Sequence, residues 1–269
     1  MNLLLIGHGY LGQAVTRVFR EAGWLVTPVS LSGGDGSIAC DVADPVAVGR
    51  LPRADCIVHC AASGRGGAAA YQQVYVDGCR NLTDVFPGVP LLFTSSTSVY
   101  AQTDGSWVTE DSLAIPERET GRLLLDAERV VLGGGGWVAR LSGIYGPGRS
   151  VILRKFLAGE AVIEDDGGRI LNQIHRDDAA RAIYHLVTAG VAGGGVFNVS
   201  DSQPLTQLAC YAGLGAMFER PLPPCGPRDP ERKRGWTHKQ VSNAKLRATG
   251  WQPEFPSFLD AAAGIADTL

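Results

Sequence analysis

A glycine-rich hexapeptide near the N-terminus has the residue spacing of a phosphate-binding turn. It consists of Gly7, His8, Gly9, Tyr10, Leu11 and Gly12, and it follows the apolar run 3–6. In such a turn the first glycine permits a tight bend, the second lets the backbone approach a pyrophosphate, and the third lets a helix pack on a strand. The amino end of the following helix would supply N–H groups and a favourable dipole. The motif predicts a dinucleotide site, and a purely structural glycine turn is the alternative.

Glycine is abundant in this chain, so the motif carries little weight by itself. With 35 glycines among 269 residues, about 0.6 matches to this pattern are expected by chance. The position of the hexapeptide supports it, because it directly follows a hydrophobic strand candidate and opens a helical stretch.

The second predicted strand lacks the acidic residue that commonly binds the adenosine ribose. Residues 27–32 read Thr-Pro-Val-Ser-Leu-Ser, and the next carboxylate, Asp35, comes late among glycines. A carboxylate at the strand end would favour NAD and repel a 2′-phosphate. Its absence, together with the hydroxyls of Ser30 and Ser32, favours NADP, although no arginine follows to bind the phosphate. We therefore assign Ser30 to the cofactor site and expect NADP or NAD, with NADP slightly favoured.

Short apolar runs alternate with helical stretches through the first half of the chain. Strands are expected at residues 3–6, 24–29, 37–40, 56–60, 90–95 and 137–141, and helices at 10–22, 68–86 and 117–132. This alternation predicts an α/β fold with a Rossmann-type, doubly wound parallel sheet. We expect a dinucleotide-binding domain over residues 1–143. Residues 144–269 are expected to form mainly a small C-terminal substrate lobe, with segments that return to the Rossmann sheet.

Composition narrows the class of partners. The net charge of −3 argues against a protein built to bind nucleic acid, and the longest basic run, residues 232–234, is interpreted as a solvated loop. The first residues lack a basic segment and a long apolar run, so no signal peptide or membrane span is expected there. The cysteines contain no CxxC pair and are interpreted as reduced thiols without a metal site. We expect a cytoplasmic protein, either a monomer or a homodimer.

A series of short motifs resembles those of the extended and atypical short-chain dehydrogenases/reductases, the NAD-dependent epimerase/dehydratase family. The motifs are the glycine loop and residues 40–42, 59–62, 76–82, 94–100, 140–148, 174–180, 197–201 and 241–246. The resemblance covers nearly the whole chain. It implies an oxidoreductase or an epimerase/dehydratase that binds NAD or NADP and acts on a small polar metabolite, with nucleotide sugars among the candidate substrates.

The resemblance also implies positions for the site residues. Asp41-Val42 would contact the adenine, and Cys60-Ala61-Ala62 would pass under the ribose. Ser95 and Ser96 would lie beside the nicotinamide and the substrate. Ser96, four residues before Tyr100, matches the family's catalytic Ser or Thr, which hydrogen-bonds a substrate oxygen while charge shifts on it. The alternative is that these hydroxyls only cap the end of a strand.

The family's Tyr-x-x-x-Lys pair is absent. Alignment on the helix at 117–132 puts Thr120 at the tyrosine position and Leu124 at the lysine position. Threonine is not a proton donor at neutral pH as an activated phenol is, and leucine lowers no pKa. Three hypotheses remain: Tyr100, Tyr145 or His175 is a substitute acid, the proton comes from substrate or water, or the chain is a non-catalytic NAD(P)-binding sensor or regulatory module.

Overall fold

The computed structural model describes residues 1–64, 66–189, 194–228 and 236–269, and the chain folds as two compact units. Unit 1 consists of Met1–Val99, Ala114–Arg140 and Ala180–Phe197, and unit 2 of Tyr100–Leu113, Leu141–Ala179 and Asn198–Leu269. Each unit is thus assembled from separate stretches of the chain. The basic run at residues 232–234 lies outside the described residues.

A seven-stranded sheet forms the centre of unit 1, with the strand order β12-β7-β5-β4-β1-β2-β3. Its strands are β1 Asn2–Ile6, β2 Leu25–Ser30, β3 Ile38–Ala39, β4 Cys56–His59, β5 Leu91–Ser96, β7 Trp137–Leu141 and β12 Gly195–Val199. β1 pairs in parallel with both β2 and β4, and the β2–β3 and β4–β5 pairs are parallel as well. The predicted doubly wound parallel sheet is confirmed.

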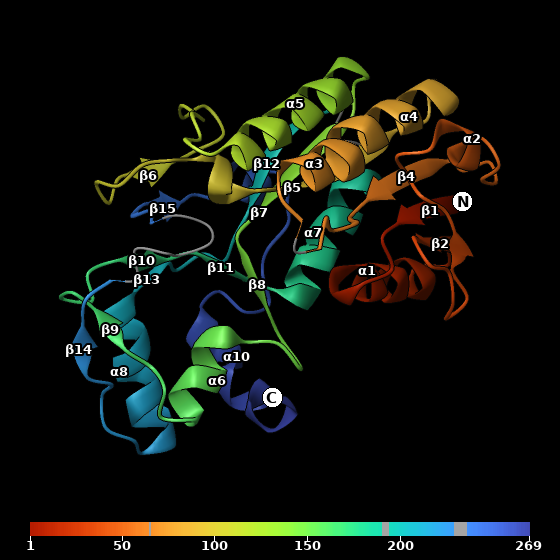
Figure 1. Cartoon of the computed structure of the whole chain (residues 1–269). Coiled ribbons are helices and arrows are strands. Elements are labelled where there is room, and N and C mark those ends of the chain that lie inside the picture. The colour runs from red at the N-terminus through yellow and green to blue at the C-terminus, as the bar shows by residue number, and fades with distance from the viewer. Residues whose placement is uncertain (65, 190–193, 229–235) are drawn as a thin grey trace. The chain divides into compact units, whose positions relative to one another are not determined.

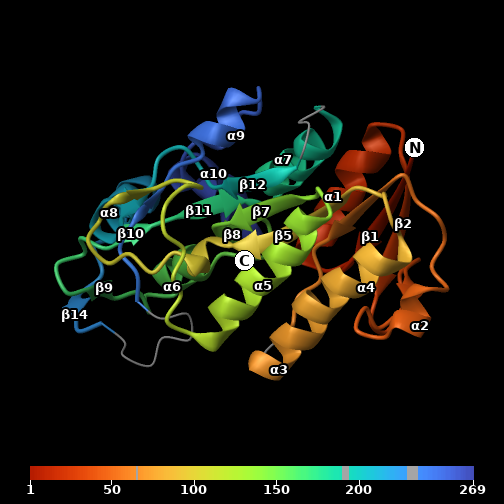
Figure 2. The same cartoon turned by 90° about the horizontal axis from the view of Figure 1, so that it is seen from above.

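Helices cover both faces of the sheet, which explains why its strands are mainly apolar. They are α1 Tyr10–Glu21, α2 Pro45–Val48, α3 Ala68–Tyr71, α4 Gly78–Val85, α5 Glu119–Gly133 and α7 Arg176–Thr188, with the 3-10 turn η2 Thr97–Val99. Figures 1 and 2 show α3, α4 and α5 over one face and α1 and α7 over the other. All four residues of β4 are buried, as expected for a strand covered on both sides.

The strand order reverses direction at β1. The chain builds β2 and β3 on one side of β1 and then places β4 on the other side. The carboxyl ends of β1 and β4 therefore flank a topological switch point, where open α/β sheets bind their ligands. Gly7 directly follows β1 and Cys60 directly follows β4, so both lie at this point.

The helix predicted at 68–86 is interrupted in its middle. Between α3 and α4 the residues Gln72–Asp77 form a π-helix, η1. The Gln72 side-chain amide donates to Asp77 Oδ1 over 2.8 Å, five residues along, which matches the wider spacing of a π turn. Such insertions are rare and occur frequently at functional sites.

Unit 2 contains short strand pairs and helices. Its elements are β6 Trp107–Val108, β8 Gly143–Tyr145, α6 Val151–Leu157, β9 Ile163–Glu164, β10 Ile170–Leu171, β11 Gln173–His175, β13 Leu205–Thr206, α8 Gln207–Phe218, β14 Cys225–Gly226, β15 Gln240–Val241, α9 Ala244–Ala248, α10 Phe258–Ile265 and η3 Ala266–Thr268. β8 pairs in parallel with β11, and β6 with β15. Tyr145, Phe156, Tyr211 and Phe258 contribute to its buried core.

Three further observations concern the described residues as a whole. None of their helices has both the length and the hydropathy needed to cross a membrane. They contain no group of three or more His, Cys, Asp or Glu side chains able to hold a metal ion. The cysteines are free thiols, and Cys225 is exposed.

Candidate functional site

The three glycines of the hexapeptide have different surroundings. Gly7 has φ +99°, and a Cβ there would lie 2.3 Å from Ala61 N. A Cβ on Gly12 would lie 2.0 Å from Gly7 O, whereas a Cβ on Gly9 would meet nothing within 4 Å. Packing therefore requires glycine at the first and third positions. Space is left open only beside the middle one of the three, where a bound group could approach the backbone.

The amino end of α1 is suited to an anion. Gly9 is the N-cap residue with φ −87° and ψ −155°, and no side chain caps the helix. The first turn of α1 contains no acidic residue, so no carboxylate compensates the positive end of the helix dipole. Backbone N–H groups at such an end bind phosphate without further special geometry.

The segment after β4 forms a wall against the glycine turn. Cys60 N donates to Ile6 O over 2.8 Å, and Cys60 Sγ donates to Gly7 O over 3.2 Å. Burial raises the pKa of the Cys60 thiol to about 12, so the thiol stays protonated and can act as a hydrogen-bond donor. The structure thus brings the predicted segment Cys60-Ala61-Ala62 together with the predicted glycine turn.

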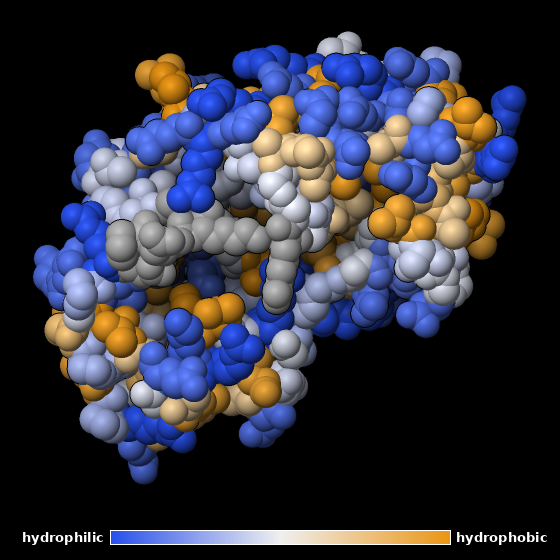
Figure 3. Space-filling view, in the orientation of Figure 1, coloured by the Kyte–Doolittle hydropathy of each residue, from blue (hydrophilic) through white to orange (hydrophobic). Residues whose placement is uncertain are grey.

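The end of β2 presents hydroxyls and apolar side chains. Ser30 Oγ lies 2.8 Å from Ser37 Oγ and donates to Gly33 O over 3.3 Å. Asp35 is exposed and has φ +49°. Leu31 is 74% exposed, and Figure 3 shows hydrophobic side chains gathered on the side where β1, β2 and α2 lie. β2 therefore ends without a carboxylate of its own.

Asp41 and Val42 lie in the connection between β3 and α2. Asp41 Oδ1 accepts a hydrogen bond from Ala43 N over 2.9 Å, and the Val42 side chain is buried. Asn81 Nδ2 donates to Val42 O over 3.0 Å, which ties this connection to α4. Contact of Asp41 and Val42 with an adenine stays a prediction.

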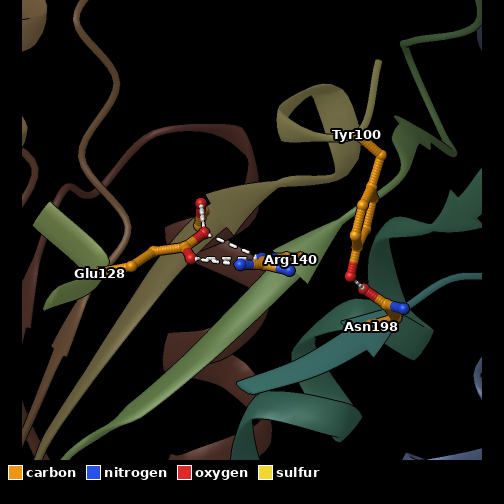
Figure 4. A network of polar contacts seen from close by, with 5 residues as sticks. Tyr100, Glu128, Arg140 and Asn198 are labelled. Carbon is orange, nitrogen blue, oxygen red and sulfur yellow. Dashed lines mark hydrogen bonds and ion pairs between the residues drawn. The ribbon is translucent and has the colours of Figure 1, made fainter. Parts of the chain in front are cut away.

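The two serines at the end of β5 have different partners. The buried Ser95 Oγ donates to Glu128 Oε1 over 2.5 Å. Glu128 in turn forms an ion pair with Arg140, with 2.6 Å between Oε2 and Nη2. Figure 4 shows the charged ends of the two side chains pointing toward one another. The half-buried Ser96 Oγ accepts from Ser98 N over 3.2 Å. The Ser95 hydroxyl is thus committed to α5, and a catalytic role for Ser96 stays a prediction.

The first turns of α5 carry no acid or base at the two positions where the motif predicts them. Thr120 is the second residue of α5 and is half-buried, and Leu124, one turn later, is 5% exposed. Neither side chain titrates in the ordinary pH range. The structure therefore places no titratable side chain at either position of the family's Tyr-x-x-x-Lys pair.

The three candidates for a substitute acid all belong to unit 2 and are all buried. Tyr100, Tyr145 and His175 are 0%, 1% and 3% exposed. The Tyr100 hydroxyl donates to Asn198 Oδ1 over 2.9 Å (Figure 4), and His175 Nδ1 accepts from Asp177 N over 3.3 Å. Burial raises the pKa of Tyr145. Roles for these residues as acids stay predictions, and in this conformation none is exposed to a ligand in solvent.

Sequence reasoning gave no role to His59, the last residue of β4. It is fully buried, and its Nε2 donates to Val74 O of η1 over 2.8 Å. Burial lowers the pKa of His59 to about 4, so the ring is neutral near pH 7. The feature of the sequence that could have indicated this role is a histidine in an otherwise apolar strand. His59 thus fixes the π-helix to the edge of the sheet that carries the candidate site.

Acid is expected to destabilise the protein through His59. Unfolding returns its pKa from about 4 to the ordinary 6.5, so the unfolded state binds more protons between these values. The free energy of unfolding is therefore highest above pH 6.5. It falls by about 3 kcal/mol in total as the pH decreases through 4. His59→Gln, whose amide can still donate to Val74 O, should remove this part of the pH dependence. Urea unfolding at pH 7 and pH 4 measures it, and an equal loss in both proteins would contradict the assignment.

Comparison with known proteins gives one family and several similar structures. Residues 3–122 match the NAD dependent epimerase/dehydratase family, and no curated protein matches the chain. A candidate NAD-dependent epimerase/dehydratase from Methylobacillus flagellatus has 28% identity and a TM-score of 0.82, over 99% of this chain and 97% of its own.

Two further structures are more distant in sequence. The human epimerase family protein SDR39U1, solved with NADPH, has 22% identity and a TM-score of 0.84 over 100% of both chains. The UDP-glucose 4-epimerase of Thermotoga maritima, solved with UDP-glucose, has 19% identity and a TM-score of 0.82, over 100% of this chain and 98% of its own. At these identities the two show a shared fold. The family match covers residues 3–122, the part of this chain that contains the glycine turn at the switch point, and the 28% identical structure shares the fold over 99% of this chain.

Proposed function

We propose that the protein binds NADP or NAD and acts as an oxidoreductase or epimerase/dehydratase on a small polar metabolite, with nucleotide sugars as the substrate class to test first. The observation that carries the proposal is the geometry of the glycine turn. Gly7 and Gly12 are required by packing, and Gly9 leaves open space at the uncapped end of α1. A purely structural turn would not need glycine at the open position.

The residues present fit a dinucleotide. The backbone of residues 7–12 and the amino end of α1 would hold the pyrophosphate. The segment 60–62 and the end of β2 would hold the ribose units, and the exposed Leu31 would offer an apolar surface to the adenine. When bound, the nicotinamide accepts or donates a hydride. The part of this chain is to orient the cofactor and to supply or remove a proton at the reacting oxygen.

We expect NADPH to bind more tightly than NADH. β2 ends in Ser30, whose hydroxyl contacts Ser37, and a 2′-phosphate there would meet hydroxyls and no strand-end carboxylate. Titration followed by the fluorescence of the reduced nicotinamide should give a lower Kd for NADPH than for NADH. Tighter binding of NADH would contradict the preference. Failure of both cofactors to bind would contradict the proposed function.

Similar structures guide the choice of substrate. Human SDR39U1 was solved with NADPH, and the Thermotoga maritima epimerase with UDP-glucose. UDP-glucose with NADP or NAD is therefore the first pair to assay, with products separated by chromatography. A protein that binds the cofactor tightly and converts no sugar nucleotide or other carbonyl compound would instead fit a non-catalytic sensor.

A further inference from the structure

The helix next to α5 carries a tyrosine near the candidate site. η1 packs against α5, the helix in which Thr120 and Leu124 replace the motif's tyrosine and lysine. Tyr75 lies in η1 and is half-buried. All of these residues belong to unit 1.

The Tyr75 hydroxyl reaches the carboxyl edge of the sheet. It accepts a hydrogen bond from Ser63 N over 3.1 Å. Ser63 directly follows the segment Cys60-Ala61-Ala62, which packs against the glycine turn. The phenol oxygen is thus held beside the loop that would pass under the cofactor, at the switch point of the sheet.

The surroundings of Tyr75 fix its ring. The ring centroid lies 5.7 Å from that of Phe93 in β5 and 4.9 Å from that of Tyr71, which meets it edge-on. One residue earlier, Val74 O accepts the hydrogen bond from His59. Gly78 lets the helix come this close, since a Cβ there would lie 3.3 Å from His59 Nε2 and 2.9 Å from Val42 Cγ1. The π turn is therefore anchored on both sides of Tyr75.

The Tyr75 hydroxyl keeps a hydrogen to donate. It accepts from Ser63 N, and no described residue of the chain accepts its own hydrogen. By contrast, the Tyr100 hydroxyl donates to Asn198, and Tyr145 and His175 are almost completely buried. A backbone N–H that already points at the phenol oxygen would also stabilise negative charge formed there when the proton leaves.

We propose that Tyr75 is the catalytic proton donor of this protein, a role that rests on the proposed function. In carbonyl reduction the bound nicotinamide would supply a hydride to the carbonyl carbon, and the C=O electron pair would move onto the oxygen. That oxygen takes the Tyr75 proton, which yields an alcohol, the oxidised cofactor and a phenolate. Ser63 N stabilises the phenolate until water returns a proton. In the oxidation direction each transfer is reversed.

The first test needs no substrate. Protein labelled with 3-fluorotyrosine gives one fluorine resonance for each of its seven tyrosines, and Tyr75→Phe assigns the resonance of Tyr75. Adding NADP⁺ should shift the Tyr75 resonance clearly and leave that of Tyr184, in α7, nearly unchanged. An unshifted Tyr75 resonance, while calorimetry shows that NADP⁺ binds, would overturn the proposal and leave the proposed function standing. Absence of binding would instead refute the proposed function.

The second test uses turnover of any carbonyl substrate that the wild type reduces. Tyr75→Phe keeps the ring and removes only the hydroxyl, so kcat should fall at least about 100-fold. The Kd for NADPH should change less than about tenfold, the worth of one hydrogen bond. Tyr184→Phe, in α7, is the matched control and should keep kcat within about threefold of wild type. A Tyr75→Phe enzyme with wild-type kcat would overturn the proposal.

Discussion

Replacing Glu128 with Ala is expected to destabilise the protein by about 3–5 kcal/mol. Glu128 and Arg140 are 2% and 6% exposed. The carboxylate binds the guanidinium through Nε and Nη2 and also accepts from Ser95 Oγ. Removing it takes this carboxylate away from a buried arginine charge and from a buried hydroxyl. Urea unfolding monitored by circular dichroism measures the change.

Two variants separate this effect from general damage to α5. Asp126 and Arg129 form an exposed ion pair on the same helix, so Asp126→Ala should cost less than about 1 kcal/mol. Replacing Glu128 by Leu and Arg140 by Met together removes both charges and should recover most of the lost stability. A Glu128→Ala protein as stable as Asp126→Ala would contradict the account of the buried pair.

The sequence predicts the sheet well because its strands are covered on both faces. Residues 3–6 of β1, 56–58 of β4 and 91–93 of β5 are continuously apolar, and the turns between the strands contain glycine. β12 was not predicted as a strand, since its place beside β7 depends on residues far apart in the chain. The π-helix could not be distinguished either, because over the six residues Gln72–Asp77 it differs from an α-helix by only a small shift in spacing.

The polar contacts of the site were harder to predict. A glutamate in a helix normally faces water, yet Leu124, Glu128 and Val131 follow the spacing of one buried face. This spacing, together with an arginine, Arg140, inside an apolar strand, is the feature of the sequence that could have predicted the ion pair. No spacing rule brings Tyr75 to Ser63, because their contact depends on how η1 packs beside β4. The glycine turn could be predicted because it is local in sequence, and the contact between Tyr75 and Ser63 could not.

Replacing Gly9 with Asp is expected to abolish tight cofactor binding while the fold is kept. A side chain at Gly9 meets no neighbour within 4 Å, and the residue is the N-cap of α1 with an ordinary negative φ. Aspartate is among the best N-cap residues, so the unfolding free energy should stay equal or rise by a few tenths of a kcal/mol. The same carboxylate would occupy the space proposed for the pyrophosphate and repel its charge. The Kd for NADPH should rise at least about 100-fold, a cost of about 3 kcal/mol.

Titration of NADPH into wild type, Gly9→Asp and Gly133→Asp tests the dinucleotide site most directly. Gly133 also has open space around it and ends α5, at the edge of the sheet opposite the carboxyl ends of the strands, so it controls for the added charge. We predict tight binding by wild type and Gly133→Asp, and at least about 100-fold weaker binding by a fully folded Gly9→Asp. Equal NADPH affinity in all three proteins would contradict the account.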